Sequence, residues 1–243
     1  MYCIFFVVVI IFTYKYIIYI FIYKYINYIF IYDLYMIYII ITTCVNNKIG
    51  VKNSYLREKR YIECINTLLQ LVSNQTNIKP IIVENNGIQE TYLNNFKCDI
   101  CYTDNNKYTF NHKGMNELLD IKHVIHKYKI QDDDYIIKLT GRYRLLNSNF
   151  IELVKKNINN YDAFVKFFNV CTKKYMFDDC VLGLFAMKCK YLYNFNYSST
   201  MLKSPECEFA DYVRKNINDN KIMEVQNLEL ECCFADDLRL LNV

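Results

Sequence analysis

The chain has 243 residues and a formal net charge of +4, and its 29 Lys and Arg residues are scattered rather than gathered into a basic stripe. That distribution argues against nucleic-acid binding. Only 5 Gly and 2 Pro exclude long flexible linkers and collagen-like or disordered classes. The length suits one α/β domain with a full core plus an appendage. The 24 Tyr and 16 Phe without Trp are typical of an AT-rich coding sequence, and the odd number of 11 Cys indicates mostly unpaired, reduced thiols.

The first 35 residues form an extension that is almost entirely apolar and aromatic. Its longest stretch without a charge, Met1 to Tyr14, is shorter than the roughly 20 residues of a membrane-spanning helix. Two interpretations stay open: an imperfect membrane anchor with snorkelling lysines, or a translated leader before an effective start at Met36 in a cytoplasmic protein. A cleaved secretory signal is disfavoured because no small-residue cleavage site follows. We therefore separate an apolar extension, 1–35, from a functional domain, 36–243.

The first half of the domain alternates apolar runs with segments of helical periodicity. The expected strands are Ile37–Thr43, Pro80–Glu84, Cys98–Thr103 and Tyr135–Thr140, and the expected helices are Ser54–Val72 and about 113–128. This alternation predicts an α/β fold with a doubly wound, mostly parallel sheet flanked by helices, which binds ligands at the carboxyl ends of its strands. Thr42, Thr43 and Glu84 fall on that edge.

The second half gives weaker patterns. Residues 161–168 predict a strand, 181–187 a further apolar element, and 223–233 a last strand. A helix is expected from Ser204 to about Lys215, because Ser at the cap and Pro205 in the first turn are helix-start signals.

Several short motifs follow one another along the chain in an informative order. They are Ile-Ile-Thr-Thr-Cys44, a basic helix start with Arg57 and Arg60, Ile-Val-Glu-Asn-Asn-Gly87, Asn111-His-Lys-Gly114 with Glu117, and Lys138-Leu-Thr-Gly-Arg-Tyr143. In this order and spacing, the stretch from 37 to about 195 resembles the nucleotide-sugar-binding half of GT-A glycosyltransferases. It is similar to small viral and bacterial enzymes with a K-x-T/S-G-R-Y motif. The resemblance implies a nucleotide-sugar donor and a glycan, lipid or protein acceptor.

The resemblance also implies roles in donor binding. The residue matching Glu84 commonly binds the base or ribose, and Thr42 and Thr43 would line the base pocket; a solvated turn acid and strand-end capping are the alternatives. The other donor-binding residues that it implies are Arg57, Arg60, Asn111, Lys113, Gly114, Lys138, Thr140, Gly141, Arg142 and Tyr143.

The usual Asp-x-Asp metal site of such enzymes is replaced here by Thr140-Gly141-Arg142. Lys138 and Arg142 are expected to neutralise the leaving nucleoside diphosphate as fixed cations, without a metal, unless they are surface charges. Mn²⁺ or Mg²⁺ remains an option if Asp132 to Asp134 are displaced ligands, and a solvated turn is the alternative for these acids.

A catalytic base is required if the enzyme inverts, and it should be a carboxylate that deprotonates the acceptor hydroxyl. The candidates are Asp178, Asp179, Glu206 and Glu208. For the two glutamates the alternative is strong, since acids are favoured at the first turn of any helix.

Other functions find less support in the sequence. Cys98-x-x-Cys101 with His123-x-x-His126 has the wrong spacing for a zinc finger, and the two cysteines would point to opposite faces of a strand. No Walker-type loop or Gly-x-Gly-x-x-Gly occurs, so a P-loop ATPase and a nicotinamide oxidoreductase are unsupported. The leading hypothesis is a hexosyltransferase. A catalytically inactive GT-A-like binding module and a membrane-anchored structural protein remain as alternatives.

Overall fold

The computed structural model describes the chain at residues 35–48, 54–110, 113–167, 178–198, 203–235 and 237–243. The chain divides into two units, Met1–Met36 and Ile37–Val243. The predicted apolar extension lies outside the described residues, apart from its last position. No helix in the described ranges is both long and apolar enough to cross a bilayer.

The second unit alternates strands and helices through its first half, as the sequence predicts. The elements there are β1 (Ile37–Thr43), α2 (Ser54–Val72), β2 (Ile78–Glu84), η1 (Tyr92–Asn95), β3 (Asp99–Tyr102), η2 (Asn105–Lys107), α3 (Lys113–Tyr128) and β4 (Tyr135–Thr140). The second half contains β5 (Arg144–Leu145), α4 (Asn149–Asn157), β6 (Ala163–Val165), β7 (Leu184–Lys188), α5 (Cys189–Asn194), α6 (Pro205–Asn216), η3 (Asp219–Lys221), β8 (Ile222–Glu224), β9 (Leu230–Cys233) and β10 (Leu240–Asn242).

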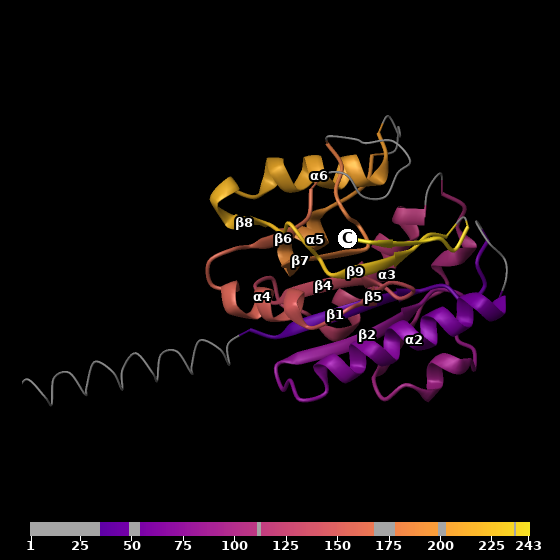
Figure 1. Ribbon diagram of the computed structural model, residues 1–243. Helices are drawn as coiled ribbons and strands as arrows, with labels where there is room; N and C mark the ends of the chain where they lie inside the picture. The colour runs from indigo at the N-terminus through magenta and orange to yellow at the C-terminus, as the bar shows by residue number, and fades with distance from the viewer. Residues whose placement is uncertain (1–34, 49–53, 111–112, 168–177, 199–202, 236) are drawn as a thin grey trace, which may run out of the picture. The chain divides into compact units, whose positions relative to one another are not determined.

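The main sheet has the strand order β3-β2-β1-β4-β7-β6-β8 (Figure 1). β1 pairs in parallel with both β2 and β4, which places Thr43 opposite Glu84 and Thr42 opposite Thr140. Among the described strands of this sheet, β7 alone runs antiparallel to its neighbours. The sheet is therefore mostly parallel, as predicted, and the ends of β1, β2 and β4 meet at one edge.

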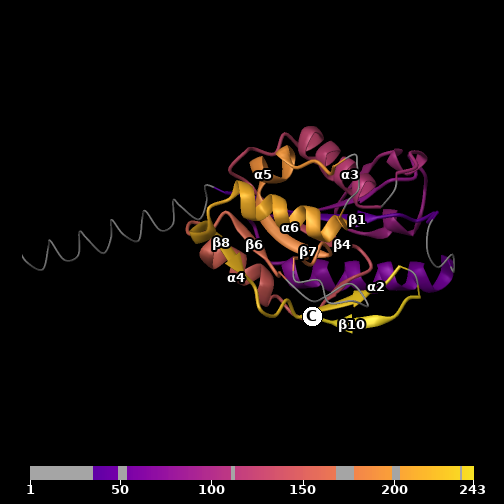
Figure 2. The same cartoon turned by 90° about the horizontal axis from the view of Figure 1, so that it is seen from above.

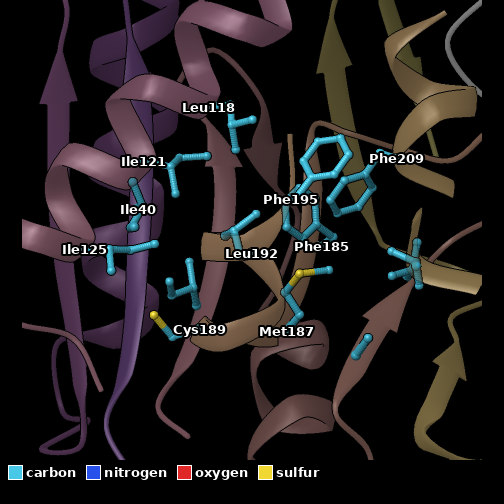
Figure 3. Packing of buried hydrophobic residues seen from close by; sticks show 14 of the residues in the cluster. Ile40, Leu118, Ile121, Ile125, Phe185, Met187, Cys189, Leu192, Phe195 and Phe209 are labelled. Atoms are coloured by element: carbon cyan, nitrogen blue, oxygen red, sulfur yellow. The ribbon is translucent and has the colours of Figure 1, made fainter. Parts of the chain in front are cut away.

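Helices cover both faces of the sheet, which is why its central strands are apolar on both sides. Figure 2 shows α2 on one side and α3 and α5 on the other. Ile121 and Ile125 of α3 lie in the same cluster as Ile40 of β1 (Figure 3). In that cluster the Phe209 ring of α6 packs 4.6 Å from Phe185 and 5.2 Å from Phe195, measured between ring centroids. Each such buried side chain stabilises the fold by roughly 1.5–3 kcal/mol.

The C-terminal part differs from the prediction. The single strand expected over 223–233 is wrong, because Glu229 adopts φ 49° and this left-handed turn interrupts the extended run. The segment instead forms β8 in the main sheet and β9 in a second sheet of order β10-β9-β5. The expected strand over 161–168 shortens to β6, and α4 was not predicted.

The predicted helix start at Ser204 is confirmed. The Ser204 hydroxyl accepts a hydrogen bond from the Cys207 amide at 3.3 Å, and Pro205 stands in the first turn of α6. Nine of the eleven cysteines lie in the described part of the chain, and no disulfide joins any two of these nine.

Candidate functional site

A cavity of about 290 Å³ opens at the carboxyl edge of the parallel strands. Its walls come from the end of β1, the first turns of α2, the segments after β2 and β3, the start of α3 and the turn after β4. Ligands of doubly wound sheets bind at this edge. The cavity is therefore the candidate ligand site.

The charged side chains on the wall have a net positive balance. Lys48, Arg57 and Arg142 are the cations that line the cavity, and Glu117 is the single carboxylate among the described lining residues. Such a surface attracts phosphate, which accepts charge-assisted hydrogen bonds. The rest of the described wall carries amides, hydroxyls and rings, including those of Asn106, Tyr108 and Phe110.

Arg57 is buried, and one of its guanidinium nitrogens lacks a hydrogen-bond partner among the described residues. The residue is 4% exposed, its Nη2 donates to the Tyr61 hydroxyl at 3.0 Å, and its Nε donates to the Cys44 carbonyl at 3.4 Å. Its Nη1 has no hydrogen-bond partner in the described part of the chain, and neither does the buried Oγ1 of Thr42. A buried donor without a partner costs roughly 1–3 kcal/mol, and more when it is charged. Both residues line the cavity, although these two atoms are themselves buried.

The Thr-Gly-Arg turn after β4 brings Arg142 to the cavity. The Gly141 amide donates to the Thr42 carbonyl at 2.9 Å, and the Tyr143 amide closes the turn by donating to the Thr140 carbonyl at 2.8 Å. A Cβ at position 141 would come within 2.9 Å of Thr43 Cγ2, so only glycine allows this approach. The motif residues thus build the turn, and Arg142 is the one whose side chain lines the cavity.

One hydrogen bond fixes the position of Arg142, and nearby groups set its electrostatics. Its Nε donates to the Cys233 carbonyl of β9 at 2.7 Å. Burial acts to lower its pKa, but nearby Tyr143, Tyr61 and Glu117 raise the pKa above its ordinary value. The guanidinium therefore stays charged.

Glu84 is buried beside the cavity, where it does not meet the requirement of its expected role in binding the base or ribose. The side chain is fully buried, and its Oε2 accepts from the Thr43 hydroxyl at 2.7 Å. The Val45 and Asn86 amides also donate to this carboxylate, at 3.1 and 3.2 Å. The expected contact with a base or ribose does not fit this geometry, because both oxygens hold the loops at the cavity rim.

Lys138 is not among the residues that line the cavity, and it is not a surface charge. Its ammonium group is buried, and its Nζ donates to Thr140 Oγ1 at 2.7 Å and to the Leu182 carbonyl at 2.9 Å. Its third contact is an ion pair with Glu117 Oε2 at 2.8 Å. Lys138 therefore has no proton left to donate to a diphosphate, so its predicted role in neutralising the diphosphate does not fit this geometry.

The remaining predicted donor residues fall around the cavity or outside the description. Arg60 bonds to the Arg142 carbonyl and to Glu231 rather than lining the cavity. Thr140 and Tyr143 are buried in and behind the turn, and Gly114 borders a smaller cavity beside Glu117. Asn111 and the side chain of Lys113 lie outside the described residues.

The four candidate bases gather at the start of α6, and none lines the cavity. Asp178 accepts from the Cys207 thiol at 3.5 Å, Asp179 is buried, and Glu208 accepts from the Ser198 amide at 2.8 Å. Burial raises the pKa of Glu206, and Asp179 and Glu117 raise it further.

The described residues do not fit a divalent cation. Asp132 to Asp134 precede β4 and so lie at the amino edge of the sheet, opposite the cavity; Asp133 pairs there with Lys188 and Lys190 at 3.8 and 3.6 Å. Glu117 is already paired with a lysine. No group of three or more His, Cys, Asp or Glu in the described ranges could hold a metal. Mn²⁺ and Mg²⁺ need several oxygen ligands, and the option that Asp132 to Asp134 supply them at this cavity does not fit their place at the opposite edge of the sheet.

Sequence reasoning missed an amide-rich support of the site. Asp120 of α3 accepts from Thr103 Oγ1 at 2.6 Å, Asn105 Nδ2 at 2.7 Å and Asn85 Nδ2 at 3.1 Å. Burial raises the pKa of Asp120 to about 6, although these donors act to lower it. The run of asparagines after β2 and β3 was the available signal, because amides beside strand ends can bind both loops and ligands.

Neither a protein-family model nor a curated protein sequence matches the chain. A solved structure of a protein from Desulfovibrio desulfuricans G20, assigned as a nucleotide-diphospho-sugar transferase, is similar. It has a TM-score of 0.50 and 10% identity, covering 79% of this chain and 80% of that one. TarS of S. aureus (residues 1–349) gives 0.49 and 14%, over 78% of this chain and 58% of that one. CMP:2-keto-3-deoxy-manno-octonic acid synthetase gives 0.49 and 10%, over 78% and 89%. The likeness to the first of these structures shows that the chain has a nucleotide-diphospho-sugar transferase-like fold.

Proposed function

We propose that the chain is a glycosyltransferase that moves a sugar from a nucleoside diphosphate sugar to a glycan, lipid or protein acceptor, like the small viral and bacterial enzymes that its motifs resemble. The observation that carries the proposal is the set of cations that line the cavity, Lys48, Arg57 and Arg142, among which Arg57 has a buried Nη1 with no hydrogen-bond partner among the described residues. A buried guanidinium N–H is best satisfied by an anionic or carbonyl oxygen. A nucleoside diphosphate offers both, and the fold supports that class of ligand.

The cations suit a metal-independent form of this chemistry. Arg142 is held at the cavity by β9 and stays charged, and Lys48 and Arg57 add two further positive groups. Fixed cations can stabilise a leaving diphosphate as it develops charge. We assign this role to Arg57 and Arg142, and not to Lys138, whose three protons already have partners.

The base that activates the acceptor remains within the group at the start of α6. Among these four candidates, burial raises the pKa of the Glu206 carboxyl, which brings it closer to the range in which a carboxyl can take a proton. The acceptor would then approach from the α6 side.

The first experiment is a donor screen on the purified chain in EDTA, using UDP-, GDP- and CMP-sugars. We expect one donor to raise the unfolding temperature and to release its nucleotide. Arg57→Lys and Arg142→Ala should each weaken binding by about tenfold or more, since hydrogen bonds to charged groups contribute about 1.5–3 kcal/mol. Arg239→Ala, at a partly exposed arginine that does not line the cavity, is the matched control.

Each other outcome has a definite meaning. Stabilisation by a donor without release of its nucleotide would favour the catalytically inactive binding module. Release of pyrophosphate from a nucleoside triphosphate would indicate nucleotidyl transfer instead. If no nucleotide sugar shifts the unfolding temperature, the proposed function is wrong.

A further inference from the structure

Glu117 is the feature of the cavity that a simple phosphate site does not explain. It is the single carboxylate among the described lining residues, which also include the cations Lys48, Arg57 and Arg142. Its side chain is 30% exposed, and it borders both this cavity and the smaller one beside Gly114. A negative group at this place opposes the binding of any phosphate next to it.

Lys138 holds the Glu117 carboxylate without competing for a ligand. The lysine ammonium has three protons, and its three partners are Thr140 Oγ1, the Leu182 carbonyl and Glu117 Oε2. The ion pair is therefore anchored to β4 from behind. A buried pair of this kind is costly to maintain compared with apolar residues, so a role for the carboxylate accounts for its presence.

The position of Glu117 divides the cavity by charge. Glu117 and Arg142 line the same cavity, so the carboxylate and the guanidinium that would hold a diphosphate both face a bound ligand. An ionised carboxylate only accepts hydrogen bonds. The part of a ligand beyond the diphosphate must therefore bring O–H or N–H donors and no further negative charge.

We propose that Glu117 makes the cavity select a nucleoside diphosphate whose terminal group is neutral and rich in hydroxyls, and discriminate against nucleoside triphosphates. The selection rests on the proposed function and narrows it. A sugar hydroxyl donates to the carboxylate, whereas a γ-phosphate at the same place would meet it with like charge. The carboxylate thus separates glycosyl donors from the triphosphate substrates of nucleotidyl transfer.

The test compares three ligand series on the full chain in EDTA: UDP, UTP and UDP-glucose; GDP, GTP and GDP-mannose; CDP, CTP and CDP-glucose. Dissociation constants are measured for the wild type, Glu117→Gln and the control Glu90→Gln. Glu90 is exposed and lies outside the cavity, so its replacement removes the same charge at a neutral place. Glutamine at position 117 keeps the shape and an oxygen for Lys138.

For the base that binds, the wild type should hold the triphosphate at least about tenfold more weakly than the diphosphate, as expected for like charges in a half-buried site. Glu117→Gln should remove most of that difference and weaken the nucleotide sugar, with little effect on the diphosphate. Glu90→Gln should change none of the ratios. A triphosphate-to-diphosphate ratio that is unchanged in Glu117→Gln would overturn the inference while leaving the proposed function intact. Failure of every nucleotide to bind the wild type would overturn both.

Discussion

Gly141 stands between the end of β1 and helix α2, and the absence of a side chain there lets the Thr-Gly-Arg turn approach both. A Cβ would lie 3.0 Å from the Thr42 carbonyl oxygen and from Tyr61 Cδ1. Neither the backbone oxygen nor the buried ring can move away without disturbing the cavity wall. One glycine thereby joins the packing of the sheet edge to the position of Arg142.

Gly141→Ala should consequently destabilise the protein by about 1–3 kcal/mol, as overpacking of a tight site does, and should weaken nucleotide binding. Urea unfolding and ligand titration measure the two effects. The control is Gly87→Asn: Gly87 has φ +84°, no atom lies within 4 Å of an added Cβ, and asparagine tolerates left-handed backbone. Equal stability of Gly141→Ala and wild type would contradict the close approach.

Asp120 links stability to pH. Burial raises its pKa in the folded protein to about 6, from the ordinary value of 3.8 for an aspartate. A raised carboxyl pKa gives stability that is complete below the unfolded pKa and is lost as pH rises through the folded pKa. The free energy of unfolding should thus fall by on the order of 3 kcal/mol between pH 4 and pH 7.5, from 1.36 kcal/mol per pKa unit. Asp120→Asn should flatten this slope in urea unfolding at several pH values. A slope that persists in the variant would assign it to another group.

At the scale of elements, β9 and α2 together hold the cavity cation Arg142. Arg60 of α2 donates from Nε to the Arg142 carbonyl at 3.0 Å and pairs through Nη2 with Glu231 Oε1 at 2.6 Å. β9 in turn accepts from Arg142 Nε through the Cys233 carbonyl. The predicted donor residue Arg60 thus acts on the site from behind the turn.

Arg60→Lys tests this arrangement, because lysine keeps the charge but not the fork of donors. We expect nucleotide affinity to fall by about three- to tenfold, while the free energy of unfolding changes by only about 1 kcal/mol. Titration and urea unfolding on the same preparation separate the two quantities. Arg239→Lys, outside the cavity, should change neither. Loss of stability without loss of affinity would reduce Arg60 to a structural residue.

The elements that the sequence predicted are those whose apolar pattern is local. β1, α2 and β4 have the expected bounds, because a run of buried β-branched residues or a helical stripe is complete within one segment. The split of the tail into β8 and β9 depended on pairing with β6 and β5, which no local pattern records. The candidate site was likewise predictable only in part. The order of the motifs located it at the carboxyl edge of the sheet, but only the packing showed that the Glu84 and Lys138 side chains turn inward.

On the scale of the whole molecule, the two edges of the sheet carry different chemistry. The carboxyl edge gathers the cavity with its cations, whereas the amino edge holds Asp133 among Lys188 and Lys190. The cavity lining begins at Thr42, and the core of the second unit begins at Ile37. Folding and ligand binding therefore draw on one continuous part of the chain.

A shortened chain starting at Met36 should accordingly match the full chain in unfolding temperature and in nucleotide affinity, within about twofold, since no interaction at the described site is removed. Thermal unfolding and titration give these two comparisons. Flotation with lipid vesicles then addresses the extension: an anchor would carry the full chain to the lipid fraction and leave the shortened chain behind, whereas a leader would leave both in the aqueous fraction. Loss of nucleotide binding in the shortened chain would contradict the prediction, because the extension would then contribute to the cavity or to the fold that supports it.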